Sequence, residues 1–219
     1  MTINFDPSNL KTILLDMDGT LLDLNFDNYF WQEFVPQKYA EKFELTIDQS
    51  KEILYEKFGR HEGTMNWYCI DFWTHELKLE IELLKHEIDH LIKIHPHVVD
   101  FLNYYSRSPI NIVLVTNAHQ KSLDLKMKKT QLNHLFDQII CAHEIGIPKE
   151  DPLFWEKLKQ SVDYEYESTM LVDDSLAVLT SAKKVGIKHL ISIIKPDSQR
   201  PERKIEEFYS INDFRELMS

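Results

Sequence analysis

Two acidic residues follow directly after a short apolar run near the N-terminus. The apolar residues at 13–15 are followed by Asp16 and Asp18, which are separated by one methionine. Buried strands rarely end in two carboxylates unless a positive charge stands beside them, because an uncompensated charge is costly to bury. Side chains alternate along an extended chain, so both carboxylates point to the same side and can face one anionic group. The pair therefore predicts a site that combines a cation with an anionic substrate.

Polar residues follow two further apolar runs in the same way. The run NIVLV ends at Thr116 and Asn117, and the run MLV ends at Asp173 and Asp174. If these runs are parallel strands, their carboxyl ends meet at one edge of a sheet, which is where ligands of such sheets bind. Three separate segments then deliver polar groups to that edge, an arrangement that chance rarely produces.

The residue types at this edge suit a metal ion and a phosphate. Asp16, Asp18 and Asp173 supply the hard oxygen ligands that Mg²⁺ prefers. Without a cation, two carboxylates about 4 Å apart repel by roughly 4 kcal/mol at an effective dielectric constant of about 20, so they would bind protons instead. A divalent ion reverses this preference and lets a phosphate approach. Gly19 gives the backbone room for a tight turn beside the site.

Neutral donors and one lysine complete the predicted site. Thr116 and Asn117 offer hydrogen-bond donors to phosphate oxygens. Lys149 follows the apolar run at 138–141, so it reaches the same edge and offsets the excess negative charge. Judged by the roles that a site must fill, these residues indicate a Mg²⁺-dependent phosphohydrolase. Spacing and periodicity alone do not define its substrate.

The elements that must position these residues form an alternating pattern, which is typical of an α/β fold with a parallel sheet. Short apolar runs predict strands at Thr12–Leu15, Ile110–Val115, Gln138–Cys141, Met170–Val172 and His189–Ile194. Helical periodicity between them predicts helices at Pro96–Arg107, Gln120–Thr130, Pro152–Ser161 and Ser175–Lys184. Pro96 and Pro152 suit the first turn of a helix, and Gly186 suits a helix C-terminus.

One region breaks the alternation, because residues 24–94 contain no convincing strand. Helical patterns in this region cover Asp27–Phe43, Ile47–Phe58, Asn66–Leu77 and Glu80–Ile94. We therefore predict an all-helical cap domain at 24–94, inserted into an α/β core domain made of residues 1–23 and 95–219.

The composition is that of a folded protein with excess negative charge. The 219 residues, of which 43% are hydrophobic, suffice for a core with a modest insert. A net charge of −11 argues against nucleic acid as a partner, and the basic run at 126–129 is predicted to be a solvated last helical turn.

Cys69 and Cys141 are too few for a disulfide framework. With no leader pattern and no membrane-length apolar run, we expect a cytoplasmic protein. The sequence does not predict an oligomeric state.

The motifs together resemble those of the haloacid-dehalogenase-like (HAD) hydrolase superfamily. Its four motifs match in order at Asp16–Thr20 (Asp-x-Asp-Gly-Thr), Thr116, Lys149 and Asp173-Asp174. The resemblance implies a Rossmann-like parallel-sheet core, with a helical cap inserted just after the first motif. The immediate succession of Asp173 and Asp174 departs from many relatives, whose second acid comes a few residues later, so the metal role of Asp174 is left open.

The resemblance also implies the role of each residue. Asp16 would be the nucleophile that forms an aspartyl-phosphate, and Asp18 the general acid and then the base that activates water. Thr116 would bind the phosphoryl group, and Lys149 would steady Asp16 and the phosphate. Mg²⁺ would be held by Asp16, the Asp18 backbone carbonyl and Asp173, supported by Asp174. The superfamily's dehalogenases lack an acid at the Asp18 position, so its presence favours phosphoryl transfer.

A closer resemblance is to the bacterial GMP/IMP 5′-nucleotidase group of this superfamily. It is carried by the segments LLDMDGTLLDLNFDNYFWQ, NWYCIDFW, VTNAH, PKED and DDS, which include part of the cap. It implies a small phosphomonoester substrate, a purine monophosphate. The alternatives are a phosphosugar or phosphoglycolate phosphatase and a phosphosugar mutase of the same superfamily. A module that has lost catalysis is disfavoured, because every motif residue is present.

Two features of the predicted cap require interpretation. The segment HEIDH fits the His-Glu-x-x-His motif of zinc proteases, but on a helix His86 and His90 point away from the apolar face, so a solvated surface is favoured. The aromatic residues of the cap have helical spacing that mainly predicts core packing. The residues predicted to face the substrate are Asp27, Asn28 and Tyr29 at the entry to the cap, with Asn66 and Trp67.

Overall fold

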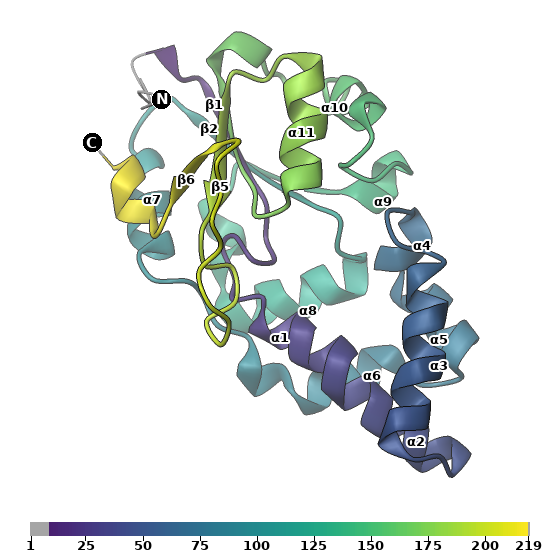
Figure 1. The fold of residues 1–219 in the computed structure, drawn as a ribbon. Coiled ribbons are helices and arrows are strands. Elements are labelled where there is room, and N and C mark those ends of the chain that lie inside the picture. The colour runs from purple at the N-terminus through teal and green to yellow at the C-terminus, as the bar shows by residue number, and fades with distance from the viewer. Residues whose placement is uncertain (1–8, 219) are drawn as a thin grey trace.

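The structure, a computed structural model, describes residues 9–218 and contains one six-stranded sheet with helices on both faces (Figure 1). The spatial order of the strands is β3-β2-β1-β4-β5-β6, and every neighbouring pair is parallel. The strands are β1 (Thr12–Leu15), β2 (Asn111–Thr116), β3 (Gln138–Cys141), β4 (Thr169–Val172), β5 (His189–Ile193) and β6 (Tyr209–Ile211). The predicted parallel α/β fold is confirmed. Residues 1–8, on which the prediction of no leader pattern mainly rests, lie outside the described part.

The register of the central strands brings the predicted site residues to one level. Leu15 of β1 pairs with Leu114 of β2 on one side and with Val172 of β4 on the other. The residues that follow these positions therefore leave the sheet at the same edge, as the sequence pattern predicted. The short edge strand β6 was not predicted, because its three residues carry no apolar run.

The side chains of β1 divide between two apolar clusters, as alternation along a strand requires. Ile13 and Leu15 pack in one cluster with α7 and α8, whereas Leu14 packs in the other with α10 and α11. Figure 1 shows α7 and the pair α10 and α11 on opposite sides of the sheet. The core helices are α7 (Val98–Tyr105), α8 (Gln120–Thr130), η4 (Leu132–Leu135), α9 (Ala142–Ile145), α10 (Pro152–Leu158), η5 (Tyr166–Ser168), α11 (Leu176–Val185) and η6 (Phe214–Leu217).

Local signals define most of the helix ends in the core. Asp151 caps α10 ahead of Pro152, and Gly186 ends α11 with a φ of 96°, as expected for a left-handed C-terminal residue. The predicted start of a helix at Pro96 is wrong. His97 adopts a φ of 63°, so α7 begins only at Val98.

The segment between β1 and α7 is entirely helical among its regular elements and lies at one end of the sheet (Figure 1). It consists of α1 (Asn25–Tyr29), the π-helix η2 (Phe30–Phe34), α2 (Val35–Phe43), α3 (Ile47–Gly59), α4 (Met65–Tyr68), α5 (Ile70–Leu77), α6 (Ile81–Glu87) and the 3-10 helix η3 (Asp89–Leu91). Two predicted helices are interrupted. Cys69 adopts an extended conformation between α4 and α5, and α6 ends before Ile88.

Two irregular connections, hydrogen-bonded to each other, join the helical segment to the core. The Asp23 N–H donates to Lys93 O, and the His95 N–H donates to Leu21 O, each at 2.9 Å. An apolar cluster runs from the β1 face into the helical segment, where it includes Trp73. Because packing is continuous across the connection, the division into a 24–94 cap and a core stays a prediction.

Two further predictions can be compared with the described residues: the exposure of two histidines and the lack of a membrane-spanning helix. His86 and His90 are exposed, as the sequence predicted, and they do not share one regular helix. None of the helices between residues 9 and 218 has the length and apolar character that a bilayer crossing requires.

Candidate active site

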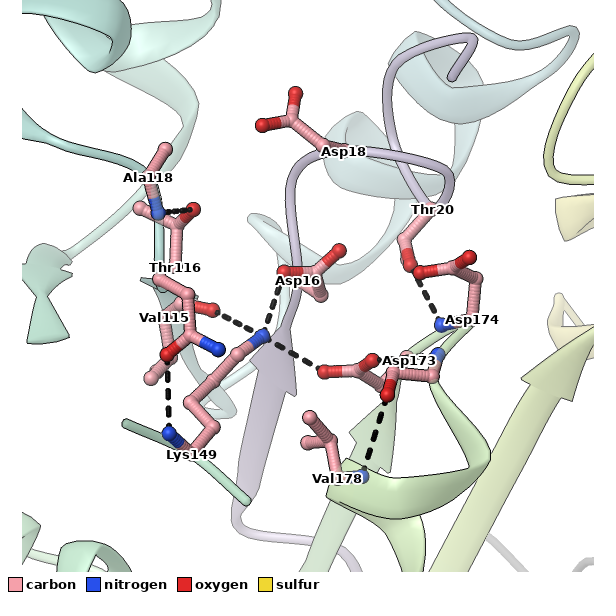
Figure 2. Close-up of polar contacts among 12 residues, drawn as sticks. Asp16, Asp18, Thr20, Val115, Thr116, Ala118, Lys149, Asp173, Asp174 and Val178 are labelled. Carbon is pink, nitrogen blue, oxygen red and sulfur yellow. Dashed lines mark hydrogen bonds and ion pairs between the residues drawn. The ribbon is translucent and has the colours of Figure 1, made fainter. Parts of the chain in front are cut away.

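The site lies where β1, β2 and β4 end (Figure 2). Asp16 follows β1, Thr116 is the last residue of β2, and Asp173 follows β4. The Asp16 N–H donates to Val172 O at 3.0 Å, and the Asp173 N–H donates to Ile191 O at 3.1 Å. These bonds extend the sheet ladder by one residue, so both carboxylates start from a rigid backbone.

Lys149 is the central cation of the site. Its side chain is 2% exposed, and Nζ lies 2.5 Å from Asp16 Oδ1, 2.7 Å from Asp173 Oδ2 and 3.1 Å from Val115 O. Three acceptors match the three protons of an ammonium group. Burial opposes the charge, but Asp16 and Asp173 outweigh it and raise the pKa of Lys149. The lysine is therefore a permanent cation that reaches the predicted edge.

Negative charge still exceeds positive charge around Lys149. Carboxylate oxygens of Asp16, Asp173 and Asp174 all lie within 4.8 Å of one another. Burial, reinforced by Asp173, raises the pKa of Asp16 to about 6 even though Lys149 opposes the shift. Burial and the charges of Asp16 and Asp173 also raise the pKa of Asp174. A cluster of three hard oxygen donors that resists ionisation fits a divalent ion such as Mg²⁺.

The two adjacent aspartates differ in how their oxygens are used. Asp173 Oδ2 accepts from Lys149, and its Oδ1 accepts from the Ser175 N–H at 2.9 Å. In the part of the chain that the structure describes, the one cation that pairs with the Asp174 carboxylate is Arg203, at 3.9 Å, and the Asp174 N–H donates to Thr20 Oγ1 at 3.1 Å. Among the described residues, Asp174 is therefore the less compensated of the two acids.

Gly19 is required beside Asp174. Its φ is 85°, and a Cβ at this position would lie 2.7 Å from Asp174 Cγ. A side chain here would meet both a strained backbone and the carboxylate. The tight turn predicted from the sequence at Gly19 therefore also brings the backbone close to the Asp174 carboxylate.

Asp18 turns away from Asp16 toward a buried network of charges. The prediction that both carboxylates point to the same side is therefore wrong, because the chain turns at Met17 and is not extended there. Its Oδ1 lies 2.6 Å from Lys126 Nζ, which also contacts Asp27 Oδ2 at 2.6 Å. Asp27 Oδ1 in turn lies 2.9 Å from Lys85 Nζ. Figure 2 shows the Asp18 carboxylate pointing away from the Asp16–Lys149 pair. The predicted solvated turn at 126–129 is wrong for Lys126, which is 1% exposed.

The surroundings of Asp18 bring the pKa of its carboxyl group close to neutral pH. Burial, together with the charges of Asp27 and Asp16, raises the pKa of Asp18 to about 6, while Lys126 opposes the shift. Burial works against ionisation of Asp27 as well, but Lys126 and Lys85 prevail and hold its pKa below the usual range. A carboxyl group that titrates near neutral pH suits general acid and base catalysis.

The sequence contained a weak signal for both lysines. Lys85 lies on the buried stripe of α6 with Ile81 and Leu84, and Lys126 lies between Leu125 and Met127, both buried. A lysine at a helical core position is unusual unless a carboxylate compensates it. Which carboxylate does so depends on packing between distant elements.

Thr116 and Asn117 have different surroundings. Thr116 Oγ1 accepts from the Ala118 N–H at 3.0 Å, which leaves its O–H to donate. The Asn117 amide accepts from the Lys149 N–H at 3.0 Å and donates to Glu150 at 2.9 Å. Asn117 therefore positions the Lys149 loop, and its binding of phosphate stays a prediction.

A cavity of about 700 Å³ opens above the carboxylates, between the sheet edge and the helical segment. Its lining includes Asp16 and Thr116 on one side and Asn28 and Trp67 on the other. Asn28 Nδ2 also donates to Asp197 at 2.6 Å. The predictions for Tyr29 and Asn66 are wrong, because both are exposed and neither lines the cavity.

A buried carboxylate paired with a lysine and a cluster of three acidic side chains therefore lie together at this sheet edge, and comparison with known proteins shows the family. Residues 13–191 match the family described as haloacid dehalogenase-like hydrolase. The chain belongs to this family, and it is a phosphatase.

Particular relatives refine this assignment. The GMP/IMP nucleotidase YrfG of Escherichia coli (strain K12) is 35% identical over 218 residues, which cover 100% of this chain and 98% of the relative. The crystal structure of a HAD phosphatase from Thermococcus onnurineus matches with a TM-score of 0.77 at 23% identity, over 95% of this chain and 96% of that chain. The HAD-hydrolase YfnB from Bacillus subtilis, solved bound to magnesium, matches with a TM-score of 0.64 at 18% identity, over 95% and 96%.

Proposed function

We propose that this phosphatase is a Mg²⁺-dependent 5′-nucleotidase that hydrolyses purine monophosphates, GMP or IMP, through an aspartyl-phosphate. The observation that carries the proposal is the 35% identity to a GMP/IMP nucleotidase, which extends over the whole chain and so includes the helical segment. That segment supplies part of the cavity lining, against which the rest of a substrate would lie.

The proposed first step uses Asp16 and Asp18. Asp16 Oδ1 is held by Lys149 at 2.5 Å, so Oδ2 is the oxygen that attacks phosphorus. As the bond from Oδ2 to phosphorus forms, the ester bond breaks, and the leaving oxygen takes a proton from Asp18. In the second step Asp18 accepts a proton from water, whose oxygen attacks phosphorus and releases phosphate from Asp16.

The remaining residues position and compensate charge. Lys149 would neutralise phosphate charge as it now neutralises Asp16 and Asp173, and the free Thr116 O–H would donate to a phosphate oxygen. Asp16, the Asp18 backbone carbonyl, Asp173 and Asp174 would hold Mg²⁺, which when bound supplies charge stabilisation for the transferring phosphoryl group. The YfnB structure with magnesium supports this choice of metal for the fold.

Aromatic side chains of the helical segment support a flat base as the substrate's distal part. Trp31, Trp67 and Tyr68 line the cavity, and Trp67 and Tyr68 are half-buried. Purine rings stack favourably on such side chains, by roughly 1–3 kcal/mol for a nucleobase. Asn28 lies on the same wall and offers an amide to polar atoms of the substrate.

A panel of phosphomonoesters tests the proposal. GMP and IMP should give the highest kcat/KM, ahead of a sugar phosphate and phosphoglycolate, with Mg²⁺ required and activity lost on chelation. Asp16→Asn should abolish turnover and leave the unfolding curve cooperative, whereas the exposed Asp163→Asn should behave as wild type. A clear preference for a sugar phosphate would reject the nucleotide assignment, and full activity of Asp16→Asn would reject the covalent mechanism.

A further inference from the structure

A second group of metal-binding side chains lies where the helical segment meets the core, outside the carboxylate site. Cys69, His119 and His143 each offer a ligand atom, and these atoms all lie within 4.8 Å of one another. Within residues 9–218, this group and the carboxylate cluster are the two sets of this kind. The three residues come from the α4–α5 joint, the residue before α8, and α9.

The backbone presents Cys69 and His119 at helix starts. Cys69 breaks the helical path with φ −86° and ψ 110°, and its Sγ accepts a weak N–H···S bond of 3.4 Å from the Phe72 N–H. His119 precedes α8, and its ring nitrogens have similarly loose contacts, at 3.4 Å to the Lys121 N–H and 3.7 Å to Asp71 Oδ2. Both side chains are therefore held near the joint without a strong competing partner.

His143 provides an independent indication of a missing ligand. Its Nε2 is buried and has no hydrogen-bond partner in the structure. A buried polar atom without a partner loses its hydration and gains no hydrogen bond in return, which is unfavourable. The rings of His143 and His119 meet edge to face, with centroids 5.0 Å apart. Burial lowers the pKa of both histidines, which favours the neutral imidazole that binds metals.

The donor set selects a different ion from the one suited to the carboxylates. One thiolate and two imidazoles suit Zn²⁺, whereas Mg²⁺ prefers oxygen ligands. Tetrahedral Zn²⁺ with bonds of about 2.0–2.3 Å places its ligand atoms roughly 3.3–3.7 Å apart. The three ligand atoms must therefore approach one another by at most about 1.5 Å, a change that side-chain rotation can supply. Asp71, near His119, or a water molecule would take the fourth position.

The surrounding contacts already join the two parts of the chain at this place. Lys121 of α8 lies 2.8 Å from Asp71 of α5 and 2.9 Å from Glu82 of α6, and Tyr68 donates to Glu150. An ion bound here would join α5 to two core segments. It would add to an existing contact and would not have to create one.

We propose that Cys69, His119 and His143 bind one Zn²⁺ ion, which fastens the helical segment to the α/β core at the rim of the cavity. The site is separate from the proposed Mg²⁺ site in its residues and in its ligand chemistry. Because a ligand that binds only the folded state stabilises it, Zn²⁺ should raise the thermal midpoint of the protein.

Metal titration of the full chain tests this proposal. In buffer with excess Mg²⁺, wild type should retain one zinc per chain after gel filtration, and Co²⁺ in its place should give a thiolate-to-cobalt absorption band. Cys69→Ser should abolish the band, and Cys69→Ser and His143→Gln should each weaken zinc binding by at least about 100-fold, since even indirect partners of a metal contribute about 10–100-fold. Neither residue lines the cavity, so phosphatase activity measured with Mg²⁺ and without zinc should be unchanged and reports correct folding.

A matched control separates this site from other sources of zinc binding. His75→Gln changes an exposed histidine of the same helix, α5, and should bind zinc and gain thermal stability as wild type does. The proposal is overturned if wild type retains no zinc, if the cobalt band persists in Cys69→Ser and so comes from Cys141, or if zinc retention depends on Asp174 and not on His143.

Discussion

Lys126 is the residue whose replacement tests the charge network around Asp18 most directly. Its Nζ lies 2.6 Å from carboxylate oxygens of both Asp18 and Asp27, and its side chain is 1% exposed. Lys126→Met keeps an unbranched apolar stem but removes the ammonium group and its charge. The two carboxylates then face each other without their shared cation.

The expected magnitude follows from the distances. Both oxygens lie 2.6 Å from the same nitrogen, so they are at most twice that distance apart. Two like charges about 5 Å apart repel by roughly 3 kcal/mol at an effective dielectric constant of about 20. Loss of one partner from a buried charge network costs about 3–5 kcal/mol in other proteins. We therefore expect Lys126→Met to lower the free energy of unfolding by about 3–5 kcal/mol at neutral pH.

Urea unfolding measures this loss, with Lys128→Met as the matched control. Lys128 lies on the same helix but is exposed, so its replacement should change stability by less than about 0.5 kcal/mol. The loss in Lys126→Met should be larger near pH 8 than near pH 5, because removal of the cation raises the pKa of Asp18 and Asp27, and protonation at low pH relieves their repulsion. A loss below about 1 kcal/mol at both pH values would refute the network's role.

Lys126→Met should also lower kcat at neutral pH. Without the cation, the pKa of Asp18 rises above its present value of about 6. A smaller fraction of Asp18 is then ionised and able to accept the proton of water in the second step. Activity should recover as the pH rises, and the pH–rate profile measures the shift. An unchanged profile would show that Asp18 does not depend on Lys126 for its titration.

Three further predictions concern the site and its cavity. Gly19→Ala should abolish most activity and raise the Mg²⁺ concentration needed for the remainder, because its Cβ would lie 2.7 Å from Asp174 Cγ; a wild-type Mg²⁺ titration would contradict this. Lys149→Met should inactivate the enzyme and lower stability by about 3–5 kcal/mol, and thermal melts should show that Mg²⁺ restores part of the loss by compensating Asp16. Trp67→Ala should raise KM for GMP at least about 5-fold with a smaller change in kcat, since stacking contributes about 1–3 kcal/mol per base; an unchanged KM would remove Trp67 from the substrate site.

The fold illustrates which elements local patterns predict well. The strands β1, β2 and β4 are apolar runs whose side chains are buried on both faces, so composition alone identified them. The edge strand β6 was missed because three residues at a sheet edge need no apolar run. The break at Cys69 was also missed. Its neighbours continue the helical apolar spacing, and nothing in that spacing records an extended residue between two helices.

Some residues of the site could be identified from local sequence patterns, whereas their contacts required the tertiary structure. Asp16, Asp18, Thr116, Lys149 and the Asp173-Asp174 pair were identified because each follows an apolar run, and parallel strands must end at a common edge. Their roles and metal contacts remain proposals that the geometry supports.

By itself, the sequence determined the parallel sheet, the helical insertion and the edge at which the acidic residues meet, because hydrophobic periodicity and strand direction are local properties. Only the tertiary structure decided that Lys126 pairs with Asp18 across 108 positions, and that Asn117 accepts a hydrogen bond from Lys149, which lies in a different loop. It alone joined Cys69 to two histidines. Such contacts depend on how separately folded elements pack, and the free energy of packing is not recorded in any one stretch of the chain.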